Sequence, residues 1–199
     1  MKRAALGLSA LSLLLSIGAA QATVITYSAK LSGPNESPPN SSPATGLTTV
    51  VIDDVENIMT VNTSFSGLTG TTTASHIHCC TTLPLTGTAG VATSLPTFPA
   101  FPLGVTSGSY TESFNLLSTS TYNAGFVTSH GGSVDSARLA FLAGLASGEA
   151  YLNIHTSAFP AGEIRGFLAE VPEPGSIALF GLGAAGLAAL RRRRGFARA

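Results

Sequence analysis

Three histidines in two segments are the residues best suited to chemistry in this chain. His76 and His78 are separated by one residue, and His155 lies in a later segment of alternating polar and apolar residues. On a β-strand, residues two apart project from the same face and lie about 6.6 Å apart along it. Both imidazoles can therefore turn toward one ion, and His155 would complete a facial set of ligands for copper or zinc.

The same histidines also have a structural interpretation. Buried imidazoles are usually hydrogen-bonded, and the partners here would be Asn153, Thr156 or backbone groups at a sheet edge. His130, in a Ser-His-Gly-Gly segment, is predicted to lie in a loop. The chain has no nucleophile motif for Ser/His/Asp catalysis, which favours a protein that is not an enzyme.

The only cysteines are the neighbours Cys79 and Cys80. Adjacent Cα atoms lie about 3.8 Å apart across a trans peptide bond, so a disulfide between them would be strained. Free thiols, an intermolecular bridge and metal ligation are the alternatives. In an oxidising compartment we favour the vicinal disulfide. As a metal ligand, only Cys80 would point the same way as His78 along a continuing strand.

One arginine and two glutamates form a candidate for a structural ion pair. Glu163 and Arg165 share a strand face, and Glu36 lies in a proline-rich loop. We predict that they pin this loop onto the later strands rather than act in catalysis.

These residues need a β-sheet to position them. Residues 149–166 read as a strand, a tight turn and a returning strand, with Tyr151, Asn153 and His155 on one face. Further strands are predicted at 23–31, 47–53, 58–65, 72–79, 109–116 and 122–127. One helix is predicted at 133–145, because Ser133 can cap it and Leu139, Leu142 and Leu145 recur at helical spacing. Residues 83–108 are predicted to be a proline-rich loop anchored by Phe98 and Phe101. The pattern indicates an all-β fold, an antiparallel Greek-key-like sandwich or barrel of about seven strands with one short helix.

Both ends of the chain carry sorting signals. Residues 1–22 have the charged, apolar and cleavage regions of a signal peptide, with small residues at Ala20 and Ala22; the alternative is an N-terminal membrane anchor. At the other end, residues 171–199 contain Pro172, Glu173 and Pro174, an apolar run, and a cluster of four arginines, Arg191, Arg192, Arg193 and Arg194. The arginines would keep that end in the cytoplasm; the alternative is an ordinary tail anchor.

The charge of the middle of the chain excludes one class of partner. Between residues 23 and 171 there are three basic and nine acidic side chains, whereas the whole chain is neutral. This acidic balance argues against nucleic acid.

Two parts of the chain resemble known protein families. The C-terminal order of Pro-Glu-Pro, apolar helix and arginine cluster resembles the PEP-CTERM sorting segment of Gram-negative bacteria, which an exosortase in the inner membrane is expected to process. The Asn35-Glu36-Ser37-Pro38-Pro39 loop, the His76-Ile77-His78 segment and the hairpin 151–166 resemble the CHRD domain. We assign this domain to residues 23–170. The resemblance implies an all-β extracellular module without an established catalytic activity.

We therefore expect an exported, non-enzymatic module that is sorted to the cell envelope or extracellular matrix. Its role would be adhesion or matrix and biofilm assembly, with polysaccharide or a surface protein as partner and transient anchoring in the inner membrane. The alternative is a metal-binding or redox protein that uses the three histidines.

Overall fold

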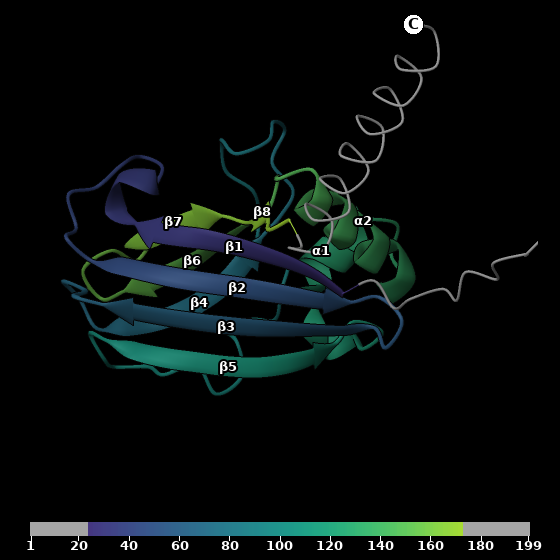
Figure 1. Ribbon diagram of the computed structural model, residues 1–199, viewed down its shortest axis with the longest axis horizontal. Coiled ribbons are helices and arrows are strands. Elements are labelled where there is room, and N and C mark those ends of the chain that lie inside the picture. The colour runs from purple at the N-terminus through teal and green to yellow at the C-terminus, as the bar shows by residue number, and fades with distance from the viewer. Residues whose placement is uncertain (1–23, 173–199) are drawn as a thin grey trace, which may run out of the picture.

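The computed structural model describes residues 24–172, which form one curved antiparallel sheet (Figure 1). Its strands are β1 Val24–Ser32, β2 Thr45–Asp53, β3 Ile58–Ser66, β4 Thr72–His78, β5 Gly108–Asn115, β6 Tyr151–Thr156, β7 Ile164–Phe167 and β8 Ala169–Glu170. They are ordered β4-β6-β7-β1-β2-β3-β5, and β8 pairs with β1. This half-barrel confirms the predicted all-β, antiparallel fold class.

The two terminal signals fall largely outside the described residues. This applies to the predicted signal peptide with Ala20 and Ala22, and to Glu173, Pro174 and the arginines Arg191 to Arg194 of the predicted sorting segment. Within residues 24–172, no helix is long and apolar enough to cross a membrane.

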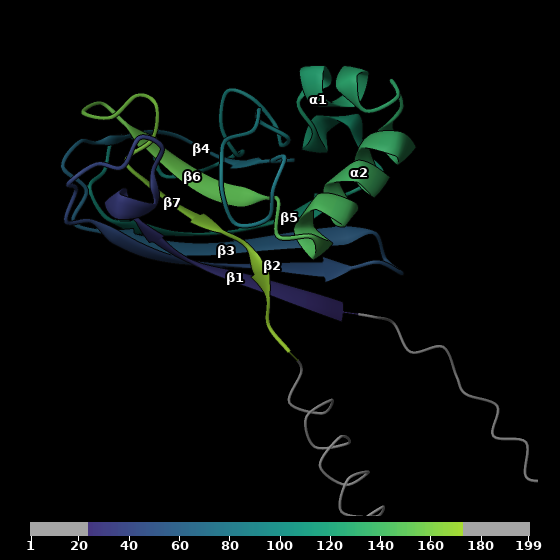
Figure 2. The same cartoon turned by 90° about the horizontal axis from the view of Figure 1, so that it is seen from above.

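The sheet curls so that β1, β2 and β3 form one layer and β4, β6 and β7 a second layer (Figure 2). The strands alternate as half-buried strands should: Val50 and Ile52 of β2 and Met59 and Val61 of β3 point inward and are almost fully buried. On the other layer, Ile77, Leu152 and Ile154 close the same core. The side chains between these inward positions therefore face outward on both layers.

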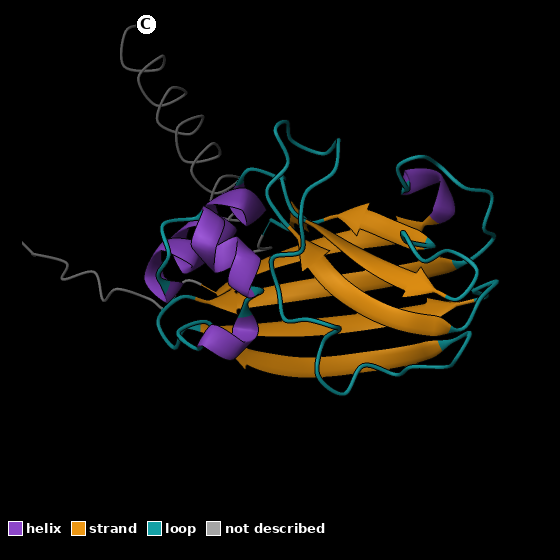
Figure 3. Ribbon diagram, turned by 180° about the vertical axis from the view of Figure 1, so that it is seen from behind, coloured by secondary structure: helices purple, strands orange, loops and turns teal. Residues whose placement is uncertain are grey.

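The two α-helices of residues 24–172 lie at one end of the sheet, and the short helix at Gly33–Asn35 lies at the other end (Figure 3). The helix predicted at 133–145 is α2 Val134–Ala146, and Ser133 caps it through a capping box with Ser136. Its buried face is formed by Ala137, Phe141 and Leu145, while Leu139 is exposed. The predicted leucine stripe is therefore wrong at Leu139, because the helix is rotated to place Phe141 in the core.

The strand predicted at 122–127 is also wrong. This segment is the short helix α1 Ala124–Ser129, preceded by the single-turn helix η2 Thr119–Thr121. Asn123 begins α1 because its side-chain oxygen accepts a hydrogen bond from the Gly125 amide at 2.9 Å. The local cap outweighs the β-propensity of the following residues.

The proline-rich segment between β4 and β5 is a loop packed on the domain, as predicted. Phe98 and Phe101 are buried, and Phe101 stacks on Phe65 with ring centroids 5.7 Å apart. The loop also bonds to the free edge of β4, where Phe98 N donates to Ser75 O at 3.0 Å. This loop, together with η1 Gly33–Asn35 and the β6–β7 turn, borders the outer side of the second layer.

Candidate metal site

The register of β4, β6 and β7 aligns polar residues in rows across the outer side of the second layer. His76 of β4 lies opposite Asn153 of β6, which lies opposite Arg165 of β7. His78 lies opposite Tyr151 in the neighbouring row. His155 is two residues beyond Asn153 and so shares its face. Strand pairing thus brings the histidines of two distant segments together.

The three imidazoles form one cluster. The ring centroids of His76 and His155 are 5.3 Å apart, those of His76 and His78 are 6.0 Å apart, and those of His78 and His155 are 5.9 Å apart. One ring nitrogen from each residue lies within 4.8 Å of the other two. Nitrogens at this separation must come closer together, by rotation of the side chains, to reach a common ion at about 2.0 to 2.1 Å.

Each ring uses one nitrogen to bond to a backbone carbonyl in a nearby loop. The bonds are His76 Nε2 to Pro96 O at 2.7 Å, His78 Nδ1 to Ala89 O at 2.9 Å, and His155 Nδ1 to Pro160 O at 3.0 Å. A carbonyl only accepts, so each of these nitrogens carries the proton. The remaining nitrogens, His76 Nδ1, His78 Nε2 and His155 Nε2, are buried and have no hydrogen-bond partner.

Burial keeps the three rings neutral at neutral pH. It lowers the pKa of His78 to about 4, and it also lowers the pKa of His76 and of His155 below the ordinary value. The bonds to the backbone carbonyls oppose this shift but do not overcome it. Neutral imidazole is the form that binds metal ions, so the cluster is in the binding form without prior loss of a proton.

An aromatic stack supports His78. The Tyr151 ring lies parallel to the imidazole, with centroids 4.8 Å apart and an interplanar angle of 6°. The Arg165 guanidinium lies 4.7 Å from the centre of the same tyrosine ring. The Tyr151 hydroxyl donates to Ala89 O, the carbonyl that also orients His78. The sequence placed Tyr151 on this face but gave no sign of the stack, which depends on strand register.

The predicted ion-pair residues separate into two sets. Arg165 Nε lies 3.8 Å from Glu36 Oε2, both side chains are buried, and Arg165 also donates to Asn35 O at 2.5 Å. This contact pins the loop that carries Asn35 and Glu36 to β7. Glu163 instead accepts hydrogen bonds from Ser42 Oγ, Thr156 Oγ1 and the backbone amides of Thr69 and Gly70.

Cys79 and Cys80 are joined by a disulfide with their Cα atoms 3.1 Å apart, closer than across a trans bond because the intervening peptide is cis. Both sulfurs pack on helix α2, where a Cβ at Gly144 would overlap them. They also line a hollow of about 300 Å³ with Phe126 and His130. Cys80 therefore has no free thiolate and does not belong to the histidine cluster.

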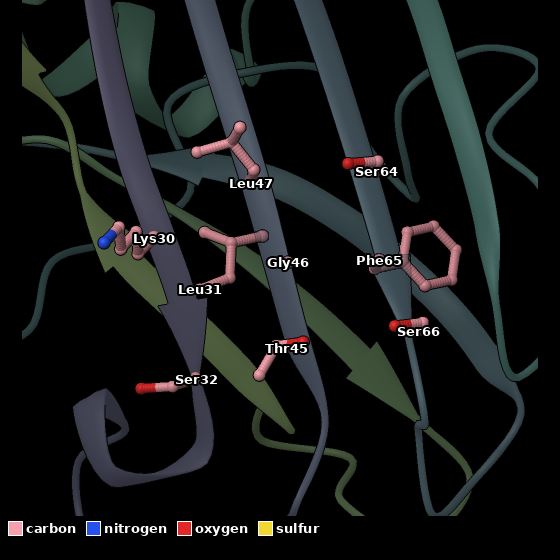
Figure 4. A pocket seen from close by; sticks show the side chains of 9 residues that line it. All are labelled: Lys30, Leu31, Ser32, Thr45, Gly46, Leu47, Ser64, Phe65 and Ser66. Carbon is pink, nitrogen blue, oxygen red and sulfur yellow. The ribbon is translucent and has the colours of Figure 1, made fainter.

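A larger hollow of about 660 Å³ lies elsewhere, on the outer side of β1, β2 and β3 (Figure 4). Serine and threonine side chains, Lys30 and Leu47 line it, together with the inward residues Leu31 and Phe65. It contains no histidine, cysteine or carboxylate. The titratable cluster and this hollow are thus on different layers.

Comparison with known families gives two matches. A family model described as the CHRD domain matches residues 27–168, and one described as the PEP-CTERM protein-sorting motif matches residues 170–194. No curated protein and no solved structure matches the chain.

Proposed function

The chain belongs to the CHRD domain family, and we propose that its domain binds one copper or zinc ion through His76, His78 and His155. Its PEP-CTERM motif marks an exported protein that an exosortase sorts to the cell surface. The metal site would therefore operate outside the cytoplasm.

The free nitrogens carry this proposal. A buried polar atom without a hydrogen bond costs about 1 to 3 kcal/mol, and each of the three clustered imidazoles has one such nitrogen. A network of ordinary hydrogen bonds accounts for only one nitrogen of each ring. A metal ion would satisfy all three remaining lone pairs at once, and carbonyls on the opposite nitrogens are the usual means of orienting histidine ligands.

The ligand set fits copper or zinc. Imidazole nitrogen is a good donor for both ions, whereas magnesium and calcium prefer oxygen. Three protein ligands leave a coordination position open, which is the arrangement of sites that bind or exchange a further ligand.

Metal analysis of the purified protein tests the proposal. We expect one copper or zinc ion per chain and loss of that ion in His76→Gln, His78→Gln and His155→Gln. His130→Gln is the matched control, because His130 is the fourth histidine of the sequence and lies on helix α1's C-terminal side. Protein that folds but takes up no copper or zinc would refute the proposal.

A second candidate function is adhesion or matrix assembly, with extracellular polysaccharide or a surface protein as partner. The observation that favours it is the outer side of β1, β2 and β3, which no segment within residues 24–172 covers and where hydroxyl side chains surround the hollow of Figure 4. Replacing Leu47 or Ser64 by Arg should then abolish binding of the purified protein to the cell surface without changing its metal content. Unaltered surface binding in these variants would argue against this role.

Export gives the proposal its setting. We propose that residues 1–22 are removed after Ala22, and that the apolar run after Pro174 holds the chain transiently in the inner membrane of a Gram-negative cell before processing. Mass spectrometry of the mature protein locates both ends. An intact N-terminus or an intact arginine cluster would contradict this part.

A further inference from the structure

We infer that the ion held by His76, His78 and His155 is monovalent copper, Cu(I). This inference rests on the proposed metal site and specifies its ligand. It follows from the charge, the burial and the number of donors around the cluster.

The donor set is electrically neutral. All three donors are imidazole nitrogens, and in residues 24–172 no carboxylate or thiolate joins the cluster. The disulfide removes both thiols of the described chain. A divalent ion would therefore keep its full double charge at this site, because no anionic ligand offsets it.

An arginine is among the charged groups beside the cluster. The Glu36 carboxylate on this side of the sheet lies against Arg165. Arg165 in turn lies over the Tyr151 ring that stacks on His78, so a single ring separates a positive charge from one ligand. This arrangement favours the bound ion of lower charge.

Burial increases the difference between ions. The exposed fraction is 5% for His76 and 9% for His78, and His155 is half-buried with its Nε2 atom buried. The cost of transferring an ion from water into a low-dielectric site rises with the square of its charge, and it is already large for a single charge. The free energy of desolvation is therefore much smaller for a monovalent ion than for Cu(II) or Zn(II) in this cluster.

The number of donors points the same way. Zinc held by three histidines keeps a water molecule as its fourth ligand, and Cu(II) favours tetragonal geometry. Cu(I) has a filled d shell like Zn(II) but a single charge, and three nitrogens can complete its coordination. Both divalent ions would need water or another ligand to enter a site with little solvent exposure.

Asn153 offers a way to change the charge without changing the shape. It lies directly opposite both His76 and Arg165, and its Oδ1 is buried without a partner. Asn153→Asp adds a carboxylate between the ligand row and the arginine. Asn62→Asp is the matched control, since Asn62 is on the outer side of β3, opposite Thr49 and Thr111.

Competition with chelators under anaerobic conditions tests the inference on the full mature protein. Cu(I) buffered by bicinchoninate, Cu(II) and Zn(II) are each titrated separately. We expect Cu(I) to bind at least about 100-fold more tightly than either divalent ion. Asn153→Asp should reduce the preference about 10-fold or more, and Asn62→Asp should leave it unchanged.

The outcomes separate the two proposals. Zn(II) or Cu(II) binding as tightly as Cu(I), with loss in the histidine variants, would overturn the Cu(I) assignment and leave the metal site intact. No binding by any of the three ions would refute the metal site itself. If Asn153→Asp does not fold, the wild-type competition alone decides.

Discussion

The outer sides of the two layers use polar residues in opposite ways. On β1, β2, β3 and β5 the outward residues form hydroxyl and amide rows, such as Thr49, Asn62 and Thr111, which remain partly or largely exposed. On β4, β6 and β7 the outward row of His76, Asn153 and Arg165 is buried at 5% exposure or less.

The difference shows on which side of the sheet polar groups reduce the stability of the fold. Exposed hydroxyls keep their water and cost little, whereas buried imidazoles and charges must find partners. Loops supply many of these partners, yet one nitrogen of each histidine stays unpaired. Such concentrated, incompletely satisfied polarity supports the proposed site.

Glu163 is the residue whose substitution should have the largest effect on stability. Its two carboxylate oxygens accept from four donors, two per oxygen. Glu163→Gln turns an NH₂ group toward two of these donors, so we expect a loss of about 3 kcal/mol in the free energy of unfolding. Urea denaturation measures it. The control Glu112→Gln on edge strand β5 should change stability by less than about 0.5 kcal/mol.

The same carboxyl group predicts a direction with pH. Burial would raise the pKa of Glu163, but the four hydrogen bonds lower it below the ordinary value. Its contribution is therefore present above a pH of about 4.3 and is lost as pH falls through the lower, folded-state pKa. Equal acid sensitivity of wild type and Glu163→Gln would show that these bonds do not stabilise the fold.

Only substitutions in the histidine cluster should remove the stabilisation that the metal ion provides. At a free ion concentration 100 times the dissociation constant, binding stabilises the native state by about 2.7 kcal/mol. We expect this increase in the free energy of unfolding in wild type and in Thr60→Ala, a variant on the outer side of β3, measured by denaturation with and without copper. His78→Gln should abolish it; an increment that persists there would place the ion elsewhere.

The stack on His78 should tune the site more weakly. Tyr151→Leu removes the ring that holds the imidazole plane, and we expect metal affinity to fall about 10-fold, as for other outer-shell changes. Tyr151→Phe keeps the ring and loses only the hydroxyl bonds to Ala89, so metal affinity should fall less in this variant than in Tyr151→Leu. Equal affinities in all three proteins would mean that the stack has no part in binding.

Glu36 gives the smallest expected effect and the opposite pH sign to Glu163. Burial raises the pKa of Glu36 to about 7, although Arg165 opposes the shift. Its contribution to stability is therefore present below about 4.3 and is lost as pH rises through about 7. In metal-free protein, Glu36→Gln should flatten the decline between pH 5 and 8. A decline as steep as in wild type would assign it to another group.

Local sequence patterns predicted most of the sheet and little of what covers it. Alternation identified the strands that became β1 to β5 and the β6–β7 hairpin, and Ser133 identified the start of α2. It also placed His76 and His78 on one face. The patterns failed at 122–127, where one asparagine cap decided the structure.

The convergence of His155 with the other histidines needed information that no local pattern holds. It depends on the register of β4 against β6, and the orientation of each ring depends on a carbonyl at Ala89, Pro96 or Pro160. These residues lie in irregular loops, where long-range contacts rather than periodicity fix the backbone.

X-ray absorption at the copper edge of the loaded protein tests the central claim most directly. The account predicts a first shell of three nitrogen scatterers at about 2.0 Å with the outer-shell pattern of imidazole, and no sulfur. The His155→Gln variant should lose one of them. A sulfur scatterer at about 2.3 Å, or a shell of oxygen atoms alone, would contradict the assignment of the ion to His76, His78 and His155.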